Sequence, residues 1–146
     1  MRIWNLYRLS ARSDLYLNKF DDARRDLMGM VKDDISQREL LAQGFAADSQ
    51  LDPSPDVESL MRRLFAGRND LVVISSATVP DILRRAGHEP GQIESALTLS
   101  ITPLYQTLSR GSGVALRNRL RPVLAAMRQD GWLGQLQARD LEIPQP

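Results

Sequence analysis

The stretch VESLMRRLFAGRNDLVVISSATVPDILRRAG, residues 57–87, decides the fold of this chain. Apolar residues recur at helical spacing over 57–65, and residues 71–74 form a short, continuous apolar run. A second helical pattern follows, with Thr78 as its cap and Gly87 just after its last turn. An apolar strand between two helices is typical of a parallel sheet that helices cover on both faces. The sequence therefore predicts an α/β fold.

Two serines, Ser75 and Ser76, directly follow the apolar run at 71–74. In open α/β sheets, ligands bind at the carboxyl ends of the strands. We therefore expect Ser75 and Ser76 at a ligand-binding position. The alternative is that both are turn residues that lead into the next helix.

The residues before this stretch contain further strand and helix patterns. Residues 3–9 are typical of a strand, and residues 20–25 of a short helix. A second apolar run spans 27–31, where Gly29 indicates a close approach by a neighbouring element. Residues 46–51 are more polar, and we expect a third, exposed strand there.

Two helix starts are predicted from capping residues. Ser36 and Glu39 have the spacing of a capping box, which predicts a helix beginning at Ser36. Ser54 precedes Pro55, and proline is favoured at the first helical position. We therefore expect Ser54 to cap the helix that contains residues 57–65.

The C-terminal part is expected to be mainly helical. Residues 93–97 favour a short helix or a loop, and residues 98–108 contain Pro103, which limits them to an edge strand or a crossing connection. Residues 114–128 have an amphipathic pattern, within which Pro122 is expected to kink or split the helix. One more short helix is expected after it.

The composition excludes several classes of protein. The chain has 146 residues and no cysteine, so it has neither disulfides nor thiolate metal sites. Its 19 basic and 18 acidic residues give no overall field that would favour nucleic acid or a membrane surface. It contains no apolar run near the ~20 residues of a membrane span, and its N-terminus lacks the apolar segment of a secretory signal.

Catalytic and metal-binding patterns are also missing from the sequence. His88 is the only histidine, and no G-x-S-x-G motif surrounds Ser75 or Ser76, so a hydrolase triad is not indicated. Asp33 and Asp34 are adjacent and lack a third ligand, so they favour a solvated loop over a metal or acid-base site. The sequence therefore predicts a protein that is not an enzyme and needs no cofactor.

An ordered set of segments carries a family resemblance: LMGMVKDD, LFAGRNDLVVISS, LSITPLYQTLSR and LRPVLAAMRQDGWLGQL. It resembles the second lobe and C-terminal tail of the type 2 periplasmic solute-binding proteins, in particular the family 3 proteins of amino-acid ABC importers. The resemblance implies that residues 1–108 form an α/β lobe. Residues 109–146 would be helices that normally pack on a first lobe, which this sequence lacks.

The resemblance also implies where a ligand would bind. The turn after the second strand of this lobe holds ligand in the family, and here it contains Asp33, Asp34 and Ser36. Amino-acid binders place an Asp after the fourth strand to take the ligand ammonium, and here Ser75 or Ser76 stands at that place. A small polar solute other than a free amino acid is therefore expected.

The function implied is that of a non-enzymatic, periplasmic solute-binding module, partial in extent, that serves an ABC-type permease. The alternative is a structural or sensory derivative of the same fold that no longer binds a solute and is used for protein–protein contacts. In either case we expect the apolar face of the helical tail to pack against another protein surface. Exchange of the C-terminal segment or of the first strand between two copies would supply one and would give a homodimer.

Overall fold

The computed structural model describes residues 2–103, 105 and 107–141, the last five of these by their backbone alone. Residues 104, 106 and 142–146, which fall within the predictions for 98–108 and 109–146, lie outside the described residues. The chain divides into two compact units, unit 1 (Met1–Thr102) and unit 2 (Pro103–Pro146). Each unit is described by itself.

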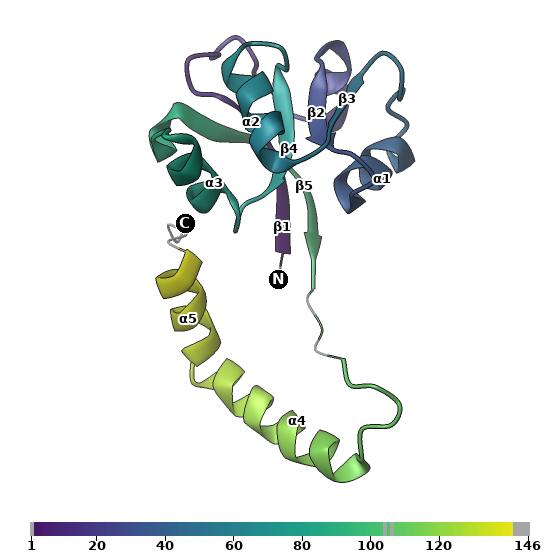
Figure 1. Cartoon of the computed structure of the whole chain (residues 1–146), viewed down its shortest axis with the longest axis vertical. Helices are drawn as coiled ribbons and strands as arrows, with labels where there is room; N and C mark the ends of the chain where they lie inside the picture. The colour runs from purple at the N-terminus through teal and green to yellow at the C-terminus, as the bar shows by residue number, and fades with distance from the viewer. Residues whose placement is uncertain (1, 104, 106, 142–146) are drawn as a thin grey trace. The chain divides into compact units, whose positions relative to one another are not determined.

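Unit 1 contains a five-stranded mixed sheet in the order β3-β2-β4-β1-β5 (Figure 1). The central strand of the α-β-α stretch runs parallel to its neighbour on one side and antiparallel to its neighbour on the other. The α/β fold class is confirmed, and the parallel pairing is limited to three strands. The strands are β1 (Arg2–Leu9), β2 (Met28–Val31), β3 (Leu51–Ser54), β4 (Leu71–Ser75) and β5 (Ile93–Thr102).

The antiparallel direction of β1 follows from its connection to β2. β1 pairs antiparallel with both β4 and β5, whereas β2 pairs parallel with β3 and β4. Residues 10–27 therefore return to the sheet at the same edge at which β1 ends. A connection of this kind places consecutive strands in opposite directions, whereas a crossover would make them parallel.

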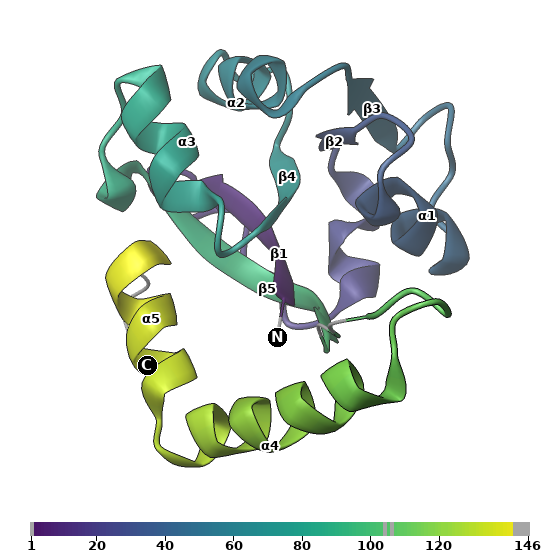
Figure 2. The ribbon, with the colours of Figure 1, turned by 60° about the horizontal axis from the view of Figure 1, so that its bottom comes forward.

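Helices cover both faces of the sheet (Figure 2). Along β4, Leu71 and Val73 belong to one apolar cluster, and Val72 and Ile74 belong to another, because successive side chains point to opposite faces. The first cluster includes Leu40 of α1, and the second includes residues of α2 and α3. The helices are η1 (Phe20–Arg25), α1 (Ile35–Ala42), α2 (Val57–Phe65), α3 (Val79–Ala86) and η2 (Pro90–Gln92).

The helices and the strand of the α-β-α stretch form as the sequence predicts, but Thr78 occupies the N-cap position of α3 without a side-chain capping hydrogen bond. The backbone N–H of Ser59 donates to the Asp56 carboxylate at 2.7 Å, which caps α2. Gly67 (φ 68°) follows α2, and Gly87 (φ 73°) ends α3 in the left-handed conformation that glycine adopts without steric cost.

Gly29 lies at the point where α2 comes closest to the sheet. A Cβ atom at Gly29 would lie 2.5 Å from Cδ1 of Leu60 and 3.0 Å from side-chain atoms of Asn69. Any larger side chain would therefore displace α2 or its neighbours. The predicted close approach at Gly29 is confirmed.

The predicted capping box of Ser36 and Glu39 is wrong. The N-cap of α1 is Asp34, whose carboxylate accepts a hydrogen bond from the N–H of Ile35 at 2.6 Å. Ser36 is buried in the first turn, and Glu39 instead accepts a hydrogen bond from the hydroxyl of Ser100 at 2.6 Å. A preceding aspartate with extended backbone took the capping position that the spacing alone assigned to serine.

The predicted strand at 46–51 and the predicted cap at Ser54 are also wrong. Residues 46–50 form a turn, in which the N–H of Ala46 donates to the side chain of Gln50 at 2.7 Å, and β3 begins only at Leu51. Ser54 is the last residue of β3, and Asp56 caps α2. Pro53 made residues 51–54 look unlike a strand, because proline is tolerated within a sheet only on an edge strand. β3 is such an edge strand.

Residues 93–97, predicted as a short helix or loop, are the first half of β5. They pair with the C-terminal half of β1, with Leu97 opposite Leu6 and Ile93 opposite Leu9. Two register shifts interrupt the pairing of β1 with β5 as a whole, which explains the irregular apolar pattern of β5. The expected edge position is confirmed as far as Thr102, because β5 is the last strand in the sheet order.

Unit 2 consists of α4 (Val114–Gln129) and α5 (Trp132–Leu141). The expectation that Pro122 would split the first of these helices is wrong, because α4 continues through it. Leu120 and Leu124 line a hollow of about 420 Å³ together with Arg117 and Arg121, and α4 has no buried residue. Among the helices described, none is long and apolar enough to cross a membrane.

Candidate functional site

The predicted site residues form two groups at the same edge of the sheet. Asp33, Asp34 and Ser36 follow the end of β2, and Ser75 and Ser76 lie at the end of β4. Strands β2 and β4 are parallel neighbours in which Met28 pairs with Leu71 and Gly29 with Val72, so their carboxyl ends reach the same edge. No hydrogen bond or ion pair joins the two groups within the described residues.

The turn after β2 has a constrained backbone. Asp33 has φ 60° and is the only non-glycine residue with positive φ in the described part of the chain. Its N–H donates to Oε1 of Gln37 at 2.7 Å, which ties the turn to the first turn of α1. The Asp34 carboxylate is engaged as the cap of α1, whereas Asp33 is exposed. Asp33 is therefore the carboxylate that this turn presents to solvent.

The turn after β4 is fixed by backbone hydrogen bonds. The carbonyl of Ser75 accepts from the N–H of Thr78 at 3.0 Å and from its hydroxyl at 2.8 Å. The N–H of Ser76 donates to the carbonyl of Ile3 at 2.9 Å, which connects this turn to the start of β1. These bonds fix the backbone of the turn that contains the two serines. They do not involve the side-chain hydroxyl of Ser75, which has no hydrogen-bond partner among the described residues.

Three buried serine hydroxyls lie along this edge. Ser36, Ser54 and Ser75 are at most 3% exposed, and their Oγ atoms have no hydrogen-bond partner among the described residues. Burying a hydroxyl without a partner costs roughly 1 to 3 kcal/mol in proteins. The same lack of a partner holds for one side-chain atom each of Asn5, Arg8 and Asn69 elsewhere in unit 1, but only the three serines lie together at neighbouring strand and helix ends, where a polar ligand or water could supply their partners.

Ser54 was not recognised from the sequence as part of this edge. It ends β3, and its carbonyl accepts from the N–H of Lys32 at 2.8 Å, which places it beside the turn after β2. A correct assignment of the edge strand, with Pro53 inside it, would have placed a third serine at a strand end. Ser54 therefore joins Ser36 and Ser75 in the candidate site.

The chemistry available at this edge is hydrogen bonding by hydroxyl groups and by one exposed carboxylate. Among the described residues, no group of three or more His, Cys, Asp or Glu side chains is arranged to hold a metal ion. Helices α1 and α3 both begin at this edge, but Asp34 and the turn at Ser75 already engage groups there. Because the exposed Lys32 and Asp33 are adjacent and opposite in charge, the arrangement suits a polar group without net charge.

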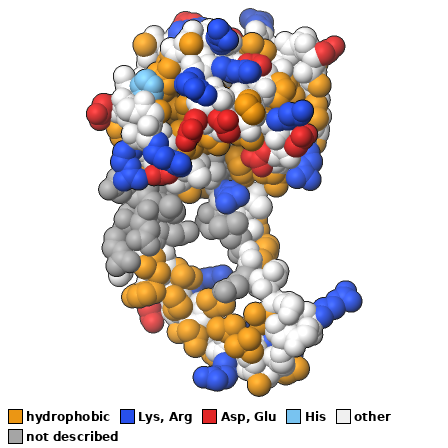
Figure 3. Space-filling view, in the orientation of Figure 1, with side chains coloured by type: hydrophobic (Ala, Val, Ile, Leu, Met, Phe, Trp, Pro, Cys, Tyr) orange, Lys and Arg blue, Asp and Glu red, His pale blue; other side chains and the backbone are white. Residues whose placement is uncertain are grey.

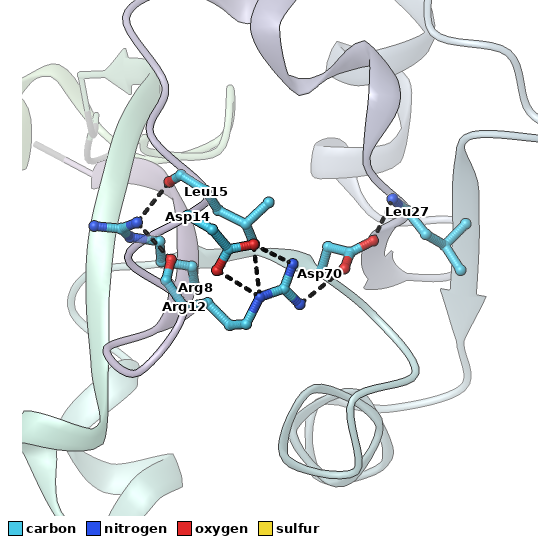
Figure 4. Close-up of polar contacts among 6 residues, drawn as sticks. All are labelled: Arg8, Arg12, Asp14, Leu15, Leu27 and Asp70. Atoms are coloured by element: carbon cyan, nitrogen blue, oxygen red, sulfur yellow. Dashed lines mark hydrogen bonds and ion pairs between the residues drawn. The ribbon is translucent and has the colours of Figure 1, made fainter.

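The opposite edge of the sheet carries a network of ion pairs (Figure 4). The Arg12 guanidinium contacts the Asp14 carboxylate at 2.9 Å and the Asp70 carboxylate at 3.2 Å, and the N–H of Leu27 donates to Asp70 at 3.1 Å. Arg8 donates to the carbonyls of Arg12 and Leu15 at 2.6 and 2.7 Å. The network joins the connection between β1 and β2 to the start of β4 and is structural.

The pKa values of two carboxyls reflect this network. The pKa of Asp14 is lowered, chiefly because Arg12 donates hydrogen bonds to its charged form. The pKa of Asp26 is raised, first by desolvation and then by the nearby charge of Asp70. Charged Asp26 is therefore destabilising where it stands.

Comparison with known proteins gives matches to structures alone. No family model and no curated protein matches the sequence. The second substrate-binding domain of a putative amino acid ABC transporter from Streptococcus pneumoniae matches 96% of this chain at 15% identity and a TM-score of 0.71, over 61% of that domain. Substrate-binding domain 2 of Lactococcus lactis GlnP matches 99% of this chain at 13% identity and a TM-score of 0.70, over 60% of its length.

A third match is a histidine kinase sensor domain with similarity to periplasmic binding proteins, at 19% identity and a TM-score of 0.66. It covers 99% of this chain and 61% of the sensor domain. At such identities the matches establish the fold and nothing about single residues. The chain has the fold of a second lobe of a type 2 periplasmic binding protein, as its sequence resemblance predicts, and it spans about 60% of the length of these structures.

Proposed function

We propose that this chain is the second lobe of a solute-binding module and takes a small polar solute at the carboxyl ends of β2, β3 and β4. The observation that carries the proposal is the row of buried, unpartnered hydroxyls of Ser36, Ser54 and Ser75. The fold supports it as well, because the matching structures include substrate-binding domains of amino acid ABC transporters.

The solute class follows from the charges at this edge. Lys32 and Asp33 are adjacent, exposed and opposite in charge, so the turn after β2 presents no excess of positive charge that would select an anionic solute. The hydroxyls of Ser75 and Ser76 replace the carboxylate that a free amino acid would need for its ammonium group. A neutral polar solute, or one with a cationic group facing Asp33, satisfies both conditions.

A complete module would also need the first lobe, which closes over the solute. We infer that this lobe comes from a further part of the same protein, from another polypeptide, or from a second copy that exchanges its C-terminal segment or its first strand. By analogy with the matching transporter domains, the module would work in the periplasm or outside the cell with an ABC permease, without catalysing a reaction. These are proposals about the whole assembly, to which this chain contributes one lobe.

The proposal is tested by following the backbone amides in ¹⁵N-labelled protein by NMR, which detects millimolar affinities. Trehalose and myo-inositol, which are neutral polyols, and agmatine, which is cationic and has no carboxylate, are titrated separately. We expect at least one of them to shift the amides of residues 32–36 and 75–78 selectively. The Ser75→Ala variant should weaken that response, whereas Ser95→Ala, which changes an exposed serine of β5, should not.

Shifts confined to other residues, or an equal response in both serine variants, would contradict the proposed site. Native mass spectrometry of the same sample reports the number of subunits and any retained small molecule. A dimer with a stoichiometric adduct would support a module completed by a second copy.

A second candidate function is a sensory or structural derivative of the fold that binds no solute and acts through protein contacts. It is favoured by the match to a histidine kinase sensor domain and by α4, which has no buried residue. This function predicts no amide shift with any of the three probes and self-association that depends on Leu120 and Leu124. The NMR titration and a sedimentation experiment therefore distinguish the two functions.

A further inference from the structure

The outward side of α2 carries a second, separate polar feature. It is an open hollow of about 370 Å³ at the flank of the helix and its C-terminal turn. Lys and Arg side chains gather on the surface around α2 in Figure 3. The hollow is lined by Pro55, Ser59, Arg62, Arg63, Ala66 and Arg68.

One arginine of the hollow is held by a carboxylate. Arg63 pairs with Asp52 at 2.5 Å, and the same carboxylate accepts a hydrogen bond from the buried side chain of Asn69 at 2.8 Å. Asp52 is therefore fully engaged by two donors. It fixes the Arg63 guanidinium in place and has little capacity left for the neighbouring cations.

The other two arginines form no ion pair like that of Arg63, although the exposed Asp56 carboxylate at the start of α2 lies close enough to Arg62 for the two charges to interact. Arg62 donates to the hydroxyl of Ser59 at 2.9 Å, one turn earlier on α2. The N–H of Arg68 donates to the carbonyl of Arg63 at 2.9 Å, which fixes the backbone after Gly67. Neither Arg62 nor Arg68 forms an ion pair among the described residues. The hollow thus contains three guanidinium groups and one carboxylate in an ion pair with them.

The position of these arginines near a helix C-terminus accounts for part of this charge. A cation there is stabilised by roughly 0.3 to 1 kcal/mol through the helix dipole. That effect explains single arginines, but it does not explain three of them around one hollow with a hydroxyl between them. Guanidinium groups match the oxygen atoms of phosphate in a planar, two-point geometry.

We propose that this hollow binds a phosphate group, held by Arg62 and Arg68 with the Ser59 hydroxyl beside them. The phosphate belongs either to a free solute or to a lipid headgroup, which share this chemistry. The hollow runs along the flank of α2 from Pro55, which follows Ser54, to Arg68 beyond the C-terminal end of the helix. The phosphate site does not rest on the proposed solute-binding function, and either can fail alone.

The test is a titration of ¹⁵N-labelled protein with inorganic phosphate, against chloride at matched ionic strength. We expect phosphate to shift the amides of Ser59, Arg62 and Arg68 selectively. The double variant Arg62→Gln/Arg68→Gln should weaken phosphate binding about tenfold or more, the loss of at least one charge-assisted hydrogen bond. The control Arg25→Gln/Arg38→Gln changes the same charge at two exposed residues and should bind as the unchanged protein does.

Vesicles of phosphatidylcholine with and without phosphatidic acid separate the two sources. Co-sedimentation with phosphatidic acid vesicles that the double variant loses would assign a lipid headgroup, and phosphate shifts without co-sedimentation would assign a free solute. The proposal is overturned if phosphate and chloride give the same shifts, if both double variants weaken binding equally, or if neither phosphate nor vesicles bind.

Discussion

Helices α2 and α4 both have an amphipathic sequence, but their apolar faces have different surroundings. In α2, Leu60, Met61 and Leu64 are at most 1% exposed and belong to the core on one face of the sheet. In α4 no residue is buried, and Val123 is 54% exposed. An apolar stripe on a helix therefore predicts that another surface covers it, but it does not show that this surface belongs to the same chain.

The largest effect expected from this comparison is on the free energy of unfolding of unit 1. Leu64→Ala should lower it by about 2 to 5 kcal/mol, because a fully buried leucine leaves a cavity. The matched change Leu124→Ala in α4 should lower it by less than about 0.5 kcal/mol. Urea denaturation followed by circular dichroism measures both variants.

A large loss for Leu124→Ala would mean that the face of α4 is covered in solution. Sedimentation velocity over a range of protein concentrations then identifies the cover. If Leu124→Ala shifts the protein from dimer to monomer, the cover is a second copy of the chain.

The second prediction concerns the close approach of α2 to the sheet. Gly29→Ala should destabilise the protein by about 1 to 3 kcal/mol, because the new Cβ atom overlaps Cδ1 of Leu60. In a Leu60→Ala background the same change should cost much less, since the overlapping atom is gone. A double-mutant cycle measured by denaturation gives this coupling. Equal costs in both backgrounds would show that Asn69 is the neighbour that resists the added atom.

The third prediction concerns the ion-pair network at the other edge of the sheet. Asp70→Ala removes the acceptor of the Leu27 N–H and one partner of Arg12, and should cost about 1 to 2 kcal/mol. Asp14→Ala removes an exposed partner of the same arginine and should cost less than about 1 kcal/mol. Chemical denaturation at low and high salt compares them. An equal loss in the two variants would mean that the network contributes through Arg12 alone.

The smallest effect is expected at Asp26 and depends on pH. The pKa of Asp26 is raised by desolvation and by Asp70, so its charge destabilises the native state above that raised pKa. Asp26→Asn should therefore stabilise the protein slightly at neutral pH. The gain should fade as the pH falls through the raised pKa, where the native carboxyl is already protonated. Thermal unfolding across the acidic range measures it, and a gain that persists at low pH would point to a cause other than charge.

The parts of the fold predicted correctly are those in which local and long-range signals agree. In helix α2, strand β4 and helix α3, the apolar periodicity agrees with the glycines that follow the two helices. Gly29 in an apolar run correctly predicted a close contact with a neighbouring element. Strand β3 and the first half of β5 were not predicted because their signals conflict: Pro53 interrupts β3, and register shifts disturb the alternation of β5.

The candidate site was predicted in position but not in detail. The strand-end rule predicted a ligand position at Ser75 and Ser76, and the family resemblance predicted one in the turn after β2. Parallel pairing of β2 and β4 brings these two positions to one edge of the sheet. The burial of Ser36 could not be inferred, because the spacing predicted Ser36 as the N-cap of α1, whereas the N-cap is Asp34. The hollow beside α2 was not predicted either, since in the sequence Arg62 and Arg63 are only two arginines near a helix end, and the sequence does not show that Arg68 and Ser59 line the same hollow.

The position of β1 has a consequence for synthesis of the chain. Within unit 1, β1 is translated before the other strands, yet it lies inside the sheet between β4 and β5, which are among the last elements of the unit. Its pairing with β5 joins Arg2 to Thr102, so the ribosome must release nearly the whole unit before the first strand has both neighbours. Such long-range closure slows folding, and it leaves β1 exposed to chaperones or to another nascent chain in the meantime.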